Sequence, residues 1–134
     1  MFGIDMELIL QPSLPHQQTG VDAVADVFAN TAIKSPTMFY ANPEITLSKD
    51  GVGQNIVAIQ KRNGIQPEHC AYSHDASCLN LDIKMETGTG KTYVYTRTMY
   101  ELHKRYSINK FIVAVPTLPI KAGARQFMED GYVK

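Results

Sequence analysis

The spacing of apolar residues predicts a helix in the first third of the chain. Val21, Val24, Ala25 and Phe28 recur at i, i+3, i+4 and i+7, which places them on one face of an amphipathic helix. The prolines at positions 12 and 15 bracket a turn-like stretch after a short apolar run at residues 7–10. The helix is therefore expected from about residue 17 to between residues 30 and 35, ahead of Pro36.

The next part of the chain has weaker patterns. Residues 36–53 are typical of a loop with a short strand at residues 45–47, and residues 54–62 predict a helix. Asn63 and Gly64 are typical of a left-handed helix ending. Residues 65–77 are polar and lack periodicity, so they are interpreted as a long loop.

A strand, a helix and a second strand are predicted in the last half of the chain. Residues 79–84 alternate apolar and polar side chains, and residues 111–115 are a continuous apolar run that ends at a proline. Between them, Tyr95, Met99, Leu102 and Tyr106 follow helical spacing, which predicts a helix over residues 91–106. This order is a βαβ unit, so we expect a parallel sheet with a right-handed crossover.

Residues 85–92 read Met-Glu-Thr-Gly-Thr-Gly-Lys-Thr and join the first of these strands to the helix. Gly88 and Gly90 permit unusual backbone angles and close approach, and amides that open a helix attract phosphate. Lys91 can reach the β- and γ-phosphates, and the Thr92 hydroxyl can ligate Mg²⁺. The segment matches the phosphate-loop signature except at its first glycine, which is Met85. The alternative is a glycine-rich turn that precedes a helix by chance.

Composition and charge narrow the class of protein. A length of 134 residues suits one domain, and no apolar run approaches the roughly 20 residues of a membrane helix. Acidic residues near the amino terminus argue against a signal peptide, so we expect a cytoplasmic protein. Residues 91–134 hold eight Lys/Arg against three Asp/Glu, which suits a phosphate ligand or a solvated face equally well.

Four side chains able to bind zinc lie close together in the predicted loop. They are His69, Cys70, His74 and Cys78. Their spacing matches no standard zinc-finger pattern, so an ordinary polar loop with free thiols is the favoured interpretation over a metal site.

The segments around the phosphate loop resemble the Res subunit of type III restriction-modification systems, a superfamily-two helicase-like ATPase. Residues 81–96 resemble motif I of that family with its flanks, including the Met-Glu opening, and residues 113–123 are similar to motif Ia. Residues 15–21 are similar to the glutamine motif, although Gly20 stands where the family more often has alanine. The resemblance is close at both ends of the chain and vague over residues 36–77.

The resemblance implies a three-layer RecA-like α/β fold with a parallel sheet. Residues 1–134 are then the N-terminal part of the first helicase/ATPase domain, incomplete at its C-terminal side, because no strand ending in an Asp-Glu motif II is present. The whole protein is expected to be an ATP- and Mg²⁺-dependent translocase and endonuclease that acts on double-stranded DNA with a methyltransferase subunit. The alternatives are another superfamily-two DNA or RNA helicase, and a noncatalytic nucleotide- or DNA-binding module.

The resemblance also assigns roles to residues. Lys91 and Thr92 are the candidate catalytic pair, with Thr92 as the Mg²⁺ ligand. Gln17 takes the position that reads adenine, although a helix-start glutamine facing water is the alternative. Thr117 and Lys121, just past a strand end, are candidates to contact DNA, with a helix cap and a solvated lysine as alternatives. The full set of candidate nucleotide-binding residues is Gln17, Thr87, Gly88, Thr89, Gly90, Lys91 and Thr92.

Overall fold

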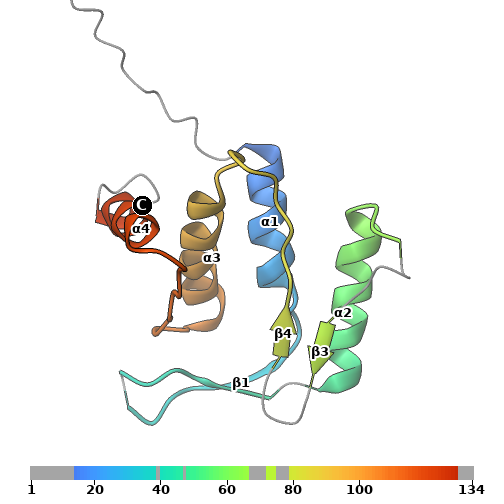
Figure 1. Ribbon diagram of the computed structural model, residues 1–134. Helices are drawn as coiled ribbons and strands as arrows, with labels where there is room; N and C mark the ends of the chain where they lie inside the picture. Colours follow the sequence, from blue (N-terminus) through green and yellow to red (C-terminus); the bar gives the residue numbers. More distant parts are fainter. Residues whose placement is uncertain (1–13, 39, 47, 67–71, 75–78, 130–134) are drawn as a thin grey trace, which may run out of the picture.

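The computed structural model describes residues 14–38, 40–46, 48–66, 72–74 and 79–129. Figure 1 shows α1 at the centre, with α3 beside it and α4 beyond α3, while α2 and a short strand pair lie on the other side of α1. The elements in chain order are α1 (Pro15–Asp26), β1 (Ala32–Lys34), β2 (Glu44–Thr46), α2 (Lys49–Arg62), β3 (Tyr72–His74), β4 (Leu79–Leu81), α3 (Lys91–Tyr106) and α4 (Leu118–Glu129).

The helices agree with the sequence pattern better than the strands do. The bounds of α3 coincide with the predicted residues 91–106, and α1 covers most of the predicted first helix. Helix α2 begins five residues earlier than predicted, at Lys49, because the Ser48 side chain accepts a hydrogen bond from Gly51 N (3.4 Å) and caps the helix. None of the described helices is long and apolar enough to cross a membrane.

Both sheets in the described part of the chain are antiparallel pairs. β1 pairs with β2 (Ile33 opposite Ile45), which confirms a strand close to the predicted residues 45–47. β3 pairs with β4 (Ser73 opposite Asn80), so the prediction of one loop over residues 65–77 is wrong at residues 72–74. That strand has no apolar periodicity, and its backbone pairing with β4 defines it.

The predicted strand at residues 111–115 is also wrong for this structure. No strand lies beside this segment among the described residues, so its backbone forms no ladder. Phe111, Ile112 and Val113 are exposed, Ile112 almost completely at 98%. The parallel pairing expected of a βαβ unit is therefore not formed, and the observed architecture is a mixed α/β arrangement.

Most of the buried residues lie on α1, α2 and α3. Val21 and Ala25 are fully buried. At the end of α1, Val27 packs with Val52 and Ile56 of α2, and β4 residues lie against this cluster. Helix α1 packs on both α3 and α2 and lies between them in the described structure (Figure 1).

Candidate nucleotide-binding site

The loop between β4 and α3 has the backbone of a phosphate-binding loop. Gly88 and Gly90 have φ values of +80° and +87°, in the left-handed region that favours glycine. Gly90 is the N-cap residue of α3 and supplies no side-chain cap, while its carbonyl accepts from Val94 N (3.0 Å). The loop thus delivers the amino end of a 16-residue helix, where anions are stabilised, to an exposed position.

The Glu86 carbonyl oxygen organises the loop from within. It accepts hydrogen bonds from Lys91 Nζ (2.6 Å) and from Thr89 Oγ1 (2.7 Å). The Lys91 ammonium group is therefore folded back over the loop. Thr92 is half-buried in the first turn of α3, and Thr87 and Gly88 are exposed.

Gln17 is placed against this loop by α1. Its Nε2 donates to Thr89 O (3.2 Å), and its Oε1 accepts from Leu14 N (3.3 Å) at the start of α1. The side chain is 7% exposed, so the alternative of a glutamine facing water is wrong. Contact with adenine stays a prediction. A Cβ added to Gly90 would collide with the Gln17 amide nitrogen, so the end of this side chain would have to move.

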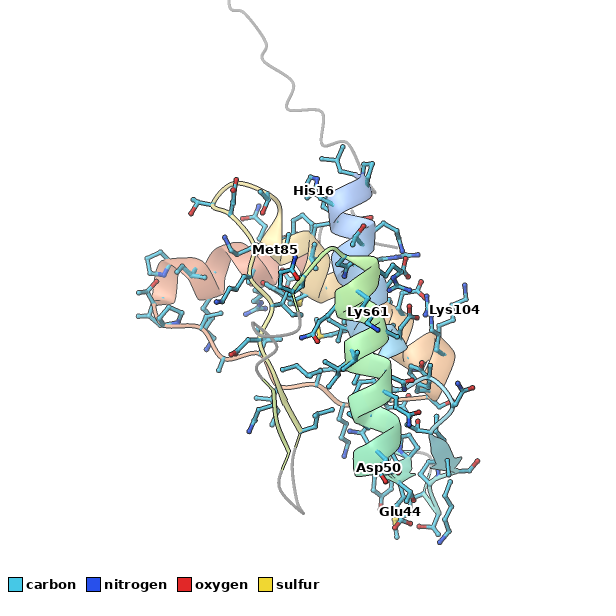
Figure 2. The ribbon with its side chains drawn as sticks, turned by 90° about the vertical axis from the view of Figure 1, so that its right-hand side faces the viewer. His16, Glu44, Asp50, Lys61, Met85 and Lys104 are labelled. Atoms are coloured by element: carbon cyan, nitrogen blue, oxygen red, sulfur yellow. The ribbon has the colours of Figure 1, made fainter. Side chains whose placement is uncertain are left out.

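His16 also contacts the loop, a role that the sequence pattern did not reveal. Its Nε2 lies 3.1 Å from Thr89 O and donates to it in the Nε2-protonated tautomer. His16 and Met85 both line a cavity of about 570 Å³ between α1, α2 and residues 81–85. Figure 2 shows them at the loop end of the molecule, whereas Lys104 lies at the far end of α3.

The candidate DNA-binding residues lie at the start of α4. Thr117 immediately precedes α4, and its carbonyl accepts from Lys121 N (3.1 Å) in the first turn. Both residues are exposed. Of the candidate zinc ligands, His69, Cys70 and Cys78 lie outside the described residues, so the interpretation of a polar loop with free thiols, favoured over a metal site, stays a prediction.

Charged side chains join α1, α2 and α3 at the end away from the loop. Arg105 of α3 donates to Asp26 (2.9 Å), Asp22 (3.0 Å) and Glu101 (3.1 Å), and Arg62 of α2 donates to Asp26 (2.8 Å). Next to them, the Tyr106 hydroxyl donates to Ala25 O (2.7 Å), and burial raises the pKa of this tyrosine. The two helices that meet at the loop are therefore also fixed to each other at their opposite ends.

A strand, a loop with two left-handed glycines and a helix that begins at Lys-Thr define a P-loop protein of mixed α/β structure. The family model of the type III restriction enzyme, res subunit, matches residues 15–131. The chain belongs to this family.

Curated relatives agree with this assignment. The chain is 44% identical over 133 residues to the Res subunit of the type III restriction-modification enzyme EcoP15I from Escherichia coli. It is 43% identical over 128 residues to the EcoPI Res subunit of Escherichia phage P1, and 39% over 127 residues to the StyLTI Res subunit of Salmonella typhimurium. These matches cover 93%, 92% and 94% of the chain, but only 13%, 13% and 10% of the respective relatives.

Proposed function

We propose that this chain is the ATP-binding part of the first motor domain of a type III Res subunit, an ATP-dependent DNA translocase and endonuclease. The observation that carries the proposal is the loop backbone: left-handed Gly88 and Gly90 lead into the uncapped start of α3, with the Lys91 ammonium folded over them. Residues 15–21, 85–92 and 113–123 act as the glutamine motif, motif I and motif Ia of residues 1–134, the N-terminal part of that domain.

The donor set fits a nucleotide triphosphate with Mg²⁺. Amides of residues 88–92 cradle the β-phosphate, and Lys91 exchanges the Glu86 carbonyl for β- and γ-phosphate oxygens. The Thr92 hydroxyl holds Mg²⁺, which neutralises charge on the phosphates when it is bound. Gln17 keeps Thr89 in place and presents its carboxamide near the base. These residues bind and orient the nucleotide.

The apolar segment 111–115, in which residues 111–114 are exposed, is the observation that supports a larger sheet in the full-length protein. A surface such as that of Ile112, 98% exposed, is unfavourable in water, and pairing as a strand would bury it. We expect this segment to join β4 in the parallel sheet of a three-layer RecA-like domain. Thr117 and Lys121, which follow directly, then face double-stranded DNA, and a modification subunit completes the cytoplasmic complex.

The test is nucleotide binding by the 134-residue chain, followed at the amide NMR signals of Gly88 and Gly90 during titration with ATP and Mg²⁺. We expect weak binding that moves both signals and is lost in Lys91→Ala, because the ammonium is the loop's cation for the phosphates. Lys104→Ala is the matched control, since this exposed lysine lies at the other end of α3. Binding that survives Lys91→Ala would overturn the proposal.

Phosphate release separates binding from turnover. We expect no measurable hydrolysis by the chain, because phosphoryl transfer also needs an acidic group to position Mg²⁺ and water, and each missing charge-stabilising donor costs a factor of about 10² to 10³. The full-length protein should hydrolyse ATP and lose that activity on Lys91→Ala. Turnover in the chain that disappears in Lys91→Ala would show a complete catalytic set within these residues.

A further inference from the structure

The guanidinium group of Arg105 links α1 to α3 at the end away from the loop. This link, formed by Arg105 with Asp22, Asp26 and Glu101, is called the joint below. Arg105 donates to Asp22 and Asp26 of α1 and to Glu101 of its own helix, at 2.9 to 3.1 Å. Its side chain is 35% exposed, and the three carboxylates are 34%, 29% and 11% exposed. Without Arg105, three carboxylates would face one another across the joint, and like charges so close repel.

Neighbouring groups only partly balance these acids. Arg62 of α2 pairs with Asp26 (2.8 Å), and Arg97 pairs with Glu101 (3.2 Å). Asp22 also accepts from the Gln18 amide (3.1 Å), a neutral group on the same helix. Among the described residues, Arg105 therefore links the two carboxylates of α1 to the carboxylate of α3.

Helix α1 connects this joint to the phosphate loop. Near its start, Gln17 donates to Thr89 O (3.2 Å), and a Cβ on Gly20 would lie 3.3 Å from Val94 Cγ1. The same helix contacts Arg105 at Asp22 and Asp26. Arg105 itself lies roughly 21 Å along α3 from Lys91, at 1.5 Å per residue, so it cannot touch a nucleotide at the loop.

We infer that Arg105 is a positioning residue for the nucleotide site: it holds α1 against α3 and thereby keeps the Gln17 amide on the Thr89 carbonyl. This inference rests on the proposed function of the loop. A rotation of α1 about Gly20, where an added Cβ would press against Val94, moves both of its ends, so a loss of attraction at Asp22 and Asp26 is transmitted to Gln17. The loop then loses one of the hydrogen bonds that fix the Thr89 peptide.

The test is a double-mutant cycle in the 134-residue chain with Arg105→Gln, Gln17→Ala and both together. We expect Arg105→Gln to raise the Kd for ATP with Mg²⁺ about fivefold, at the lower end of measured coupling between distant sites. In the Gln17→Ala background the same change should leave the Kd within about twofold, because the hydrogen bond through which Arg105 acts is already absent. Equal effects in both backgrounds would overturn the inference.

A second measurement needs no nucleotide. The Gln17 side-chain amide and Gly90 backbone amide signals of the free chain should shift in Arg105→Gln. They should stay unchanged in Lys34→Gln, which removes an exposed ion pair with Glu44 (3.6 Å) in the β1–β2 hairpin. If the wild-type chain binds no ATP, the proposed function fails, whereas unchanged Gln17 and Gly90 signals in Arg105→Gln overturn the positioning role alone.

A milder variant keeps the test decisive where Arg105→Gln unfolds the chain. Asp22→Asn preserves the shape of the side chain and removes one of the two α1 carboxylates that Arg105 contacts. We expect the same Gln17 and Gly90 signals to shift in the same direction by a smaller amount. Asp22→Asn with native helix content and unshifted signals would overturn the inference.

Discussion

The contact between α1 and α3 differs sharply from the segment that follows α3, although both are rich in apolar residues. In the contact, Val21 and Ala25 are completely buried, and polar groups at both ends of the helices find partners. After α3, Ile112 is 98% exposed and Leu118 80% exposed. Val21 and Ala25 are thus covered by described residues, whereas the side chains of Ile112 and Leu118 are not.

The difference between these regions shows how far the apolar pattern of a sequence predicts burial. Helical spacing correctly identifies Val21 and Ala25 as buried, whereas the continuous apolar run at residues 111–115, which predicted a strand, is neither a strand nor buried. The pattern does not say what will cover each segment. A helix forms its own backbone hydrogen bonds, whereas a strand depends on a neighbour.

The strongest test of this comparison is a pair of truncations. Val21→Ala should lower the free energy of unfolding by about 2 kcal/mol, from lost methyl burial and the cavity left behind. Ile112→Ala, which removes more carbon, should change it by less than about 0.5 kcal/mol, because its side chain is almost fully solvated. Urea unfolding followed by circular dichroism measures both. A large effect of Ile112→Ala would show that residues 111–115 are packed in solution.

The parts of the fold that were predictable depend on local signals. Helix α3 has the predicted bounds, since a glycine loop precedes Lys91 and the apolar stripe ends at Tyr106. Strand β3 was missed because its sequence has no alternation and only pairing with β4 creates it. The side chain of Asn42 was also missed: it accepts from Asn109 N and Lys110 N, both at 2.8 Å, and so fixes the hairpin to the end of α3.

The candidate site also has some residues that local sequence signals predict and others that they do not. Gly88, Gly90, Lys91 and Thr92 could be located because the signature is contiguous. The contact between Gln17 and Thr89 joins residues 72 positions apart, so no local pattern contains it. One part of its geometry had a local signal: Gln17 occupies the third position of α1, where a glutamine reaches back to the N-cap amide.

A substitution at Gly20 tests how tightly α1 packs against α3. In an open helix, Gly→Ala would stabilise by about 1 kcal/mol. Here the new methyl group lies 3.3 Å from Val94 Cγ1, so we expect a clearly smaller gain. Val94→Ala should also cost less in the Gly20→Ala background than alone, by about 0.5 kcal/mol or more, because the two side chains share one space. If the effects of Gly20→Ala and Val94→Ala were additive, and Gly20→Ala gave the full stabilisation of about 1 kcal/mol, α1 and α3 would not be closely packed at this point.

The last expected effect is a dependence of stability on pH that comes from the Tyr106 hydroxyl at the far end of the same contact. Burial raises its pKa in the folded chain, while Arg105 lowers it and Asp26 raises it, with a net increase. The folded state therefore retains this proton to higher pH than the unfolded state does. The associated stability is complete below the ordinary tyrosine pKa of about 10 and decreases as pH rises beyond it.

Urea unfolding between pH 8 and 11 should show this decrease in the wild type and a shallower one in Tyr106→Phe. That variant should also lose about 1 kcal/mol at neutral pH, because Ala25 O loses its donor. Equal slopes in the two proteins would mean that Tyr106 titrates alike in both states, and that the α1–α3 contact does not bury it in solution.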